Sequence, residues 1–349
     1  MALTDKQIIA FLELPRIGRK TVEELGYLST GFIDDNDLYD FFTWAKLKRK
    51  RSIPPFTSKD LALALQEAER KLEQTQKAGI NWVTLYDPNY PAVLRDVRSE
   101  DGKRSAVPIM IYYKGNLQLL SSPSIAIIGS REALPQSEKA ANFLAYSFAS
   151  RGLNIVSGLA LGCDTAAHQG ALKTGTGKTI AVLGNGLDTI YPPQNTDLAA
   201  EILEQGGLLL SEYEMGTNAA NYTFVERDLI QAGISKAVIV AQTKIDGGSM
   251  HAAIAASYAG KRVYAVKYTD PQLDHSDYNN GNHELVQNYG ASYIVAIKDK
   301  EHMNNYLDTI TNEILYTWFW LVILLSKYKV SSISNYNSSY TRKKDMANL

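Results

Sequence analysis

Four small-residue loops could bind anions through their backbone N–H groups. Each follows a short apolar run typical of a buried strand and lies in or near the start of a helical stretch. Glycine lets backbone N–H groups approach a ligand closely, and a helix N-terminus favours negative charge. One such loop suits one phosphate, whereas a row along a sheet edge suits a polyphosphate, a dinucleotide or a nucleic-acid backbone. The candidate residues are Gly129, Ser130, Arg131, Ser157, Gly158, Gly162, Gly186, Gly248 and Ser249.

The alternative is that these glycines only turn the chain, and for a single loop that alternative is preferred. Arg131 is the sharpest individual candidate, because a permanent cation directly follows the Gly-Ser pair. Its competing interpretation is a surface ion pair. A second basic surface is predicted near the N-terminus, at Arg16, Arg19 and Lys20. The basic run 46–51 is assigned to a linker after nearby aromatic residues.

No motif for catalysis or metal binding accompanies these loops. The five histidines form no HExxH pattern, no Gly-x-Ser-x-Gly elbow is present, and Cys163 is the only cysteine. Asp164 and His168, four residues apart, are expected to be a first-turn acid and a packed histidine. We therefore expect no catalytic residue, no metal and no cofactor.

Composition limits the class of protein. The chain has 349 residues, of which 45% are hydrophobic and 21% charged, which is typical of globular proteins. The formal net charge is −1, so binding to nucleic acid requires a local basic patch. No signal peptide is visible at the N-terminus, and the 12-residue apolar run at 314–325 is too short to span a membrane alone. We expect a cytoplasmic protein without membrane contact.

The apolar pattern predicts an α/β fold. Nine short apolar runs alternate with helical stretches, which predicts a doubly wound, mostly parallel sheet over residues 80–300. Residues 1–75 are predicted to form a small all-helical domain containing a helix–turn–helix or hairpin, with Ser58 able to cap one helix. Residues 301–349 are predicted to be a tail with a short apolar helix and a disordered end.

Several spaced motifs resemble the DNA-processing protein A family, also called DprA or Smf. The chain reads AIIGSR at 126–131, SGLALGCDTAAHQGAL at 157–172 and AVLGNGLDTIYPPQN at 181–195, each close to the family pattern. The resemblance covers residues 90 to 270. It implies an extended Rossmann-like domain, usually dimeric, that binds single-stranded DNA and loads the RecA recombinase during natural transformation, with no catalytic group required.

The resemblance adds candidate DNA-binding residues, and the chain also departs from the family pattern. It implies a DNA-binding role for Asn195 and a phosphate contact for Arg227, and Lys178 and Lys244 are weaker candidates beside strand ends. The family pattern F-x-x-R-N-R reads FVERDL at 224–229, so Asp228 replaces an asparagine and Leu229 replaces a cation. We expect this change to weaken phosphate binding there.

Two other functions remain open at this stage. One is a nucleotide-processing Rossmann enzyme resembling a phosphoribohydrolase, for which Glu212, just after an apolar run, is the best available carboxylate. The other is a nucleotide-sensing module that signals through the tail. The leading prediction is a non-catalytic homodimer that binds single-stranded DNA and delivers RecA.

Overall fold

The computed structural model describes residues 3–29, 31–48, 55–175 and 178–316. The chain forms two compact units, residues 1–296 and 297–349. The first unit contains a nine-stranded sheet. Its strands are β1 (Asn81–Thr84), β2 (Met110–Gly115), β3 (Ser124–Ile128), β4 (Asn154–Ser157), β5 (Thr179–Val182), β6 (Leu208–Ser211), β7 (Ala237–Val240), β8 (Arg262–Lys267) and β9 (Ser292–Val295).

The sheet order is β1-β2-β6-β5-β4-β3-β7-β8-β9. The seven strands from β3 to β9 pair in parallel, and β1 and β2 join antiparallel beside β6. Every residue of β3, β4, β5, β6 and β7 is buried, which explains why these strands are continuous apolar runs in the sequence. The predicted doubly wound, mostly parallel fold is confirmed.

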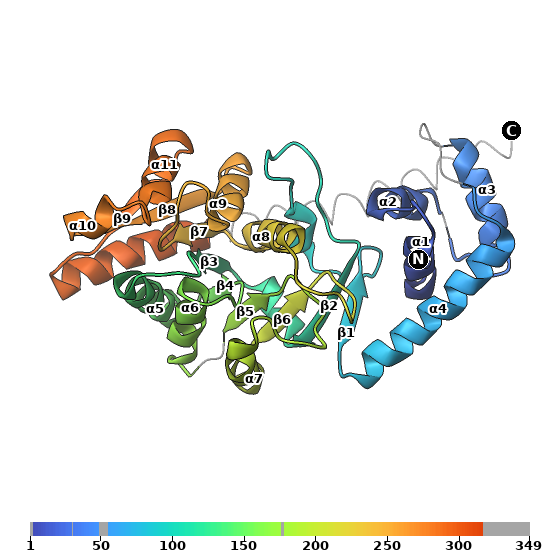
Figure 1. Cartoon of the computed structure of the whole chain (residues 1–349), viewed down its shortest axis with the longest axis horizontal. Coiled ribbons are helices and arrows are strands. Elements are labelled where there is room, and N and C mark those ends of the chain that lie inside the picture. Colours follow the sequence, from blue (N-terminus) through green and yellow to red (C-terminus); the bar gives the residue numbers. More distant parts are fainter. Residues whose placement is uncertain (1–2, 30, 49–54, 176–177, 317–349) are drawn as a thin grey trace, which may run out of the picture. The chain divides into compact units, whose positions relative to one another are not determined.

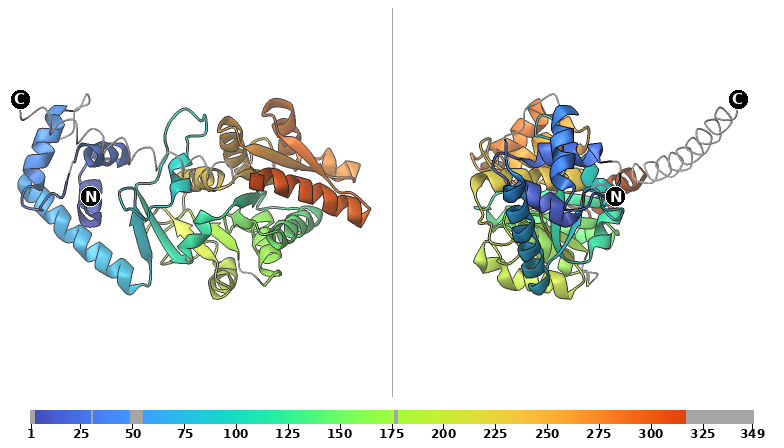
Figure 2. Two further views of the ribbon diagram at one scale, coloured as in Figure 1. Left: turned by 180° about the vertical axis from the view of Figure 1, so that it is seen from behind. Right: turned by 90° about the vertical axis from the view of Figure 1, so that its right-hand side faces the viewer.

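Helices cover both faces of the sheet (Figure 1; Figure 2 gives the view from behind). One face carries α5 (Pro135–Ser150), α6 (Cys163–Leu172) and α7 (Thr196–Glu204). The other carries α8 (Asn221–Ile234), α9 (Ser249–Tyr258) and α11 (Asn280–Asn288), and the short α10 (Pro271–Asp274) precedes α11. Strand order reverses between β3 and β7, and ligands of such folds bind at this switch point, beyond the carboxyl ends of the strands.

The chain before the sheet is helical, as predicted. Its helices are α1 (Asp5–Glu13), α2 (Arg19–Leu28), α3 (Leu38–Lys48) and α4 (Ser58–Lys77). Two local expectations need correction. The cap of α4 is Thr57, whose hydroxyl accepts a hydrogen bond from the backbone N–H of Asp60, so Ser58 is the first helical residue. Residues 46–48 end α3 instead of forming a linker, and 49–54 lie outside the described residues.

The second unit is described only up to residue 316, and it is helical from 300 onward. The apolar run 314–325 and the tail predicted to be disordered therefore lie mostly outside the described residues. Within the described ranges, no helix is long and apolar enough to cross a membrane.

Candidate nucleic-acid interface

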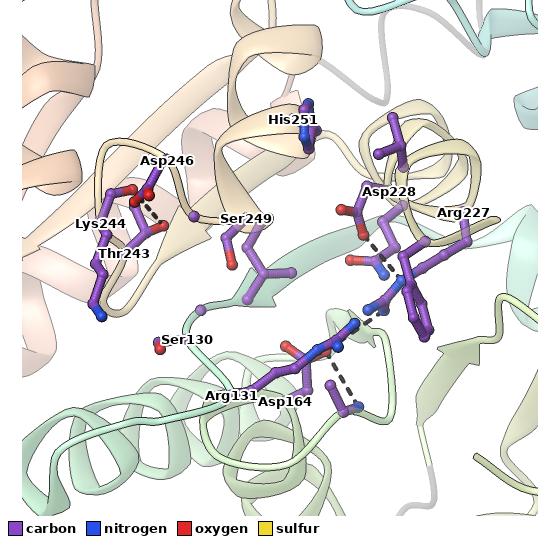
Figure 3. A pocket seen from close by; sticks show the side chains of 18 of the residues that line it. Ser130, Arg131, Asp164, Arg227, Asp228, Thr243, Lys244, Asp246, Ser249 and His251 are labelled. Carbon is purple, nitrogen blue, oxygen red and sulfur yellow. Dashed lines mark hydrogen bonds and ion pairs between the residues drawn. The ribbon is translucent and has the colours of Figure 1, made fainter. Parts of the chain in front are cut away.

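A cavity of about 450 Å³ lies at the switch point of the sheet. The loops after β3 and β7 form its walls, together with α8 and the start of α9 (Figure 3). It brings together seven of the predicted residues: Gly129, Ser130, Arg131, Arg227, Lys244, Gly248 and Ser249. Sequence positions as distant as 129 and 249 meet here because the carboxyl ends of parallel strands share one edge.

Arg131 is the exposed cation of this cavity. Its guanidinium lies over the ring of Phe224, with Cζ 4.3 Å from the ring centroid. Among the described residues, no carboxylate forms an ion pair with it, so the competing interpretation as a surface ion pair does not hold. Stacking on an aromatic ring fixes the plane of the guanidinium and leaves its N–H groups available to an anion.

Arg227 occupies a different environment, because its side chain is buried between two carboxylates. Nη1 lies 3.5 Å from Oδ2 of Asp164, and Nε lies 3.0 Å from Oδ1 of Asp228. Burial raises the pKa of both carboxyl groups, to about 6 for Asp228, although the Arg227 charge opposes the rise. The positive charge of Arg227 is therefore largely balanced within the protein, in contrast to that of Arg131.

Several buried polar atoms around Arg227 have no hydrogen-bond partner among the described residues. They are Nε and Nη1 of Arg227, whose N–H directions miss the neighbouring carboxylates, and both amide atoms of Gln231. An unsatisfied buried donor costs about 1–3 kcal/mol, so a ligand that accepts from these donors gains that energy. Phosphate oxygens are acceptors of this kind, and both residues line the cavity.

Close packing explains two of the predicted glycines. A Cβ atom on Gly158 would lie 1.0 Å from Nη1 of Arg227, so only glycine leaves room for that guanidinium. Gly162 has φ +75° and caps α6, and a Cβ there would lie 2.5 Å from the carbonyl oxygen of Ser130. The β4–α6 loop can thus pack directly against the β3 loop that carries Arg131.

Two further predicted residues, Ser157 and Asn195, hold the β4–α6 loop in place through hydrogen bonds. Ser157 is fully buried and its hydroxyl donates to the Ile127 carbonyl. Asn195 is buried, and its Nδ2 donates to the Leu159 carbonyl at 2.8 Å and to Oγ1 of Thr165 at 2.9 Å. The Asp164 carboxylate accepts from the Gly158 N–H at 3.1 Å. Ser157 and Asn195 therefore support the loop instead of lining the cavity.

Gly186 and Lys178 do not line the cavity at the switch point. Gly186 packs beside Asp188 and Glu214, where a Cβ would lie 2.5 Å from the Glu214 carbonyl oxygen. Lys178 immediately precedes β5, at the amino end of a parallel strand and hence at the opposite edge of the sheet. The row of four anion-binding loops therefore reduces, at this cavity, to the loops after β3, β4 and β7.

The loop after β7 is held in place by the residues around the start of α11. Oδ1 of Asn282 accepts from the Thr243 N–H, and Oδ1 of Asn280 accepts from the Ile245 N–H, both at 3.0 Å. Within this loop, Nζ of Lys244 lies 4.7 Å from the Tyr278 ring centroid. Lys244 is thus a second cation of the cavity, on the wall opposite Arg131 (Figure 3).

Residues 81–305 match the family model described as DNA recombination-mediator protein A. The chain belongs to this family. It is similar to DNA processing protein DprA of Streptococcus pneumoniae, with 39% identity over 216 residues that cover 62% of this chain and 71% of that protein. It is similar to Protein Smf of Escherichia coli, with 32% identity over 248 residues, 69% of this chain and 65% of that protein.

Solved structures of the DNA recombination-mediator protein A family share the fold. DprA from Streptococcus pneumoniae matches with a TM-score of 0.66 and 29% identity, over 84% of this chain and 95% of that one. The Helicobacter pylori protein, whose structure concerns its single-stranded DNA binding mode, matches with a TM-score of 0.55 and 31% identity, over 68% of this chain and 98% of that one. Nucleic acid is thus bound by at least one relative of this fold.

In this member of the family, one cation of the second basic surface, Arg19, is paired with two acids. Arg19 of α2 forms ion pairs with Glu212 at 2.9 Å and with Glu226 at 3.2 Å. Burial raises the pKa of Glu212 to about 7, against the opposing effect of Arg19. Glu212 does not line the switch-point cavity, so the carboxylate considered for nucleotide hydrolysis is separated from the anion-binding loops.

The other two cations of the second basic surface, Arg16 and Lys20, are both exposed. Arg16 is exposed with φ 63°, in the turn before α2. Lys20 is exposed and lines a second hollow together with Arg19 and Glu23.

His168 is buried, with Nδ1 2.7 Å from Oγ1 of Thr179, and burial lowers its pKa to about 3, so it is a packed histidine as predicted.

Phe224 and Gln231 are among the residues that line the cavity but were not predicted as site residues. Phe224 lies between two guanidiniums, since Cζ of Arg227 is 5.8 Å from its ring centroid. It also packs against Tyr191, with ring centroids 5.8 Å apart. The signal for Phe224 was its place three residues before Arg227 in the family pattern. Gln231 has no comparable signal, because a buried glutamine in a helix looks like any polar helix position.

Proposed function

We propose that this protein binds single-stranded DNA at the switch-point cavity and acts, without catalysis, as a homodimer that delivers the RecA recombinase to that DNA. The observation that carries the DNA-binding part is Arg131, an exposed guanidinium that is stacked on Phe224 and has no acidic partner among the described residues. The family and the relative from Helicobacter pylori support the same ligand. The RecA and dimer parts rest on the family resemblance.

The cavity offers the two kinds of contact that a single strand needs. Arg131 and Lys244 are cations for phosphates, and the backbone N–H of Ser249 stands at a glycine-rich loop that opens α9, whereas the N–H of Ser130 donates to the Gln242 carbonyl. Phe224 and Tyr191 present aromatic rings beside Arg131, and stacking of a base on such a ring is worth about 1–3 kcal/mol. Tyr191 is half exposed, so a base can reach it.

The test is a titration of the full chain with single-stranded oligonucleotide at several salt concentrations. Arg131→Ala should weaken binding by roughly 10- to 100-fold, the effect of losing one charge-assisted hydrogen bond worth about 1.5–3 kcal/mol. The slope of log affinity against log salt should fall by about 1. The matched control is Arg70→Ala, which removes an exposed guanidinium of α4 whose ion-pair partner among the described residues is Glu67.

Equal affinity and equal salt slope for Arg131→Ala and the unchanged protein would show that the strand binds elsewhere. Base release from nucleoside monophosphates that is abolished by Glu212→Gln would instead support the hydrolase. RecA delivery is tested separately, by RecA filament formation on DNA covered with single-strand-binding protein. Failure of that assay with intact DNA binding would limit the function to DNA binding.

A further inference from the structure

Two histidines and an aspartate converge where α10 ends, outside the switch-point cavity. Asp274 is the last residue of α10, His275 follows it, and His283 lies in α11. One ligand atom from each residue, an imidazole nitrogen or a carboxylate oxygen, lies within 4.8 Å of the other two. The DNA-binding proposal makes no use of these residues.

The aspartate of this cluster is buried and only partly satisfied by hydrogen bonds. Asp274 is 3% exposed, and its Oδ1 accepts from the Tyr268 N–H at 2.9 Å. Its Oδ2 lies 3.5 Å from Nε2 of His283, too far for a good hydrogen bond. A buried carboxylate needs a cation or several donors, and Oδ2 is aimed at the imidazole.

The imidazole ring of His283 is held by a hydrogen bond at each nitrogen, and the ring of His275 stacks on it. Nδ1 of His283 is hydrogen-bonded to the hydroxyl of Tyr293 in β9, so the ring orientation is fixed from the side away from Asp274. Nε2 of His283 points to Asp274, 2.7 Å from its carbonyl oxygen. The His275 ring stacks on His283, with centroids 5.6 Å apart and planes 13° apart. A hydrogen bond from the second ring nitrogen is the usual support of a ligating histidine.

We propose that Asp274, His275 and His283 bind a divalent transition-metal ion, Zn²⁺. Two imidazole nitrogens and one carboxylate oxygen are Zn²⁺ ligands, and water would complete a tetrahedron. Ligand atoms in such a site are about 3.3 Å apart for bonds of about 2.0 Å. His275 is exposed, so its ring can rotate to close the remaining gap.

Binding requires two changes, because the Asp274 carbonyl oxygen lies 2.7 Å from Nε2 of His283 and occupies the direction in which a ligated ion would lie. In the described structure, Nε2–H donates to the Asp274 carbonyl, so Nδ1 accepts from the Tyr293 hydroxyl. With the ion present, the proton resides on Nδ1 and donates to the Tyr293 oxygen, and the Nε2 lone pair faces the metal. The imidazole stays neutral in both forms, its tautomer changes, and the Asp274 carbonyl turns away from Nε2 to leave room for the ion.

The consequence lies in the wall of the cavity. The ion would join the end of α10 to α11, and the first turn of α11 holds the β7 loop through Asn280 and Asn282. A bound ion would therefore stiffen the loop that carries Lys244 and Ser249. This inference goes beyond the proposed function, since it concerns ion binding by the chain alone.

The experiment uses the full chain without a histidine tag, stripped with a chelator and titrated with ZnCl₂ by calorimetry. Co²⁺ absorption reports the ligand geometry. One ion per chain is expected. His275→Ala and His283→Gln should each weaken binding by at least tenfold, and Tyr293→Phe by roughly 10-fold through loss of the orienting hydrogen bond. The matched control is His302→Ala, an exposed histidine whose Nδ1 lies 2.8 Å from Oδ1 of Asp299 and which joins no three-ligand cluster among the described residues.

Absence of zinc binding by the unchanged chain would overturn the proposal, and so would equal affinity in His275→Ala. Because His275 is exposed, its alanine variant tests the site even where His283→Gln fails to fold, and circular dichroism identifies that failure. Arg131→Ala should retain full zinc affinity. The zinc-binding proposal and the DNA-binding proposal can therefore be refuted independently.

Discussion

Replacement of Asp228 by asparagine should strengthen single-stranded DNA binding. The carboxylate lines the cavity proposed to hold a phosphate, and it stands where the family pattern has asparagine. A phosphate in a cavity of about 450 Å³ would lie roughly 5–8 Å from this carboxylate, and at an effective dielectric constant of about 40 two such charges repel by about 1–2 kcal/mol. The affinity gain is therefore roughly 5- to 30-fold at pH 7.5.

The pH dependence gives an independent check of the same reasoning. Burial raises the pKa of Asp228 to about 6, so the carboxylate is charged at pH 7.5 and largely neutral at pH 5.5. The affinity of the unchanged protein should rise as pH falls through this range, because protonation removes the repulsion. Asp228→Asn should lack this increase in DNA affinity, whereas other titrating groups change the affinity of both proteins with pH.

The assay is fluorescence anisotropy with a labelled oligonucleotide at pH 5.5, 6.5 and 7.5 and fixed ionic strength. Asp197→Asn, which removes an exposed carboxylate of α7, is the control for net charge. The electrostatic argument is refuted when Asp228→Asn binds no more tightly than Asp197→Asn at pH 7.5 and keeps the pH slope of the unchanged protein.

Two further predictions concern buried groups near the site. Gly158→Ala places a Cβ 1.0 Å from Nη1 of Arg227, so it should destabilise the fold by about 1–3 kcal/mol and weaken DNA binding, whereas Gly31→Ala, with open space around it, should do neither. Urea unfolding and anisotropy measure both effects. Because burial lowers the pKa of His168 to about 3, the unfolded chain binds a proton first as pH falls, and the free energy of unfolding should drop by about 2 kcal/mol between pH 7 and pH 5. His168→Leu should remove that drop in urea titrations, and an unchanged drop would mean that other groups cause it.

The sequence was sufficient to predict the sheet and the edge where the site lies. Each of the nine apolar runs overlaps a strand, and the signal is clearest for β3 to β7, because strands buried on both faces leave little room for polar residues. The carboxyl ends of parallel strands then place the loops at 129–131 and 245–249 together. The order of the strands brings only three of the four predicted anion-binding loops to the cavity. Long-range packing sets this order.

The charge environment of the site was harder to predict. Arg131 and Arg227 look alike in sequence, yet one is exposed on Phe224 and the other is buried between Asp164 and Asp228. The difference arises because one face of α8 packs on the sheet, and a single sequence does not show which face that is. The histidine cluster could not be predicted for a related reason, since its members lie at the end of α10, directly after it and in α11, and match no regular spacing.

The hollow at the switch point exists because the chain leaves β3 toward one face of the sheet and β7 toward the other. The backbone path thus sets the shape of the hollow, and a few replaceable side chains set its electrostatic potential. An engineer could tune ligand preference across a graded set of charge variants on one unchanged scaffold, as long as the glycines that let the loops touch are kept.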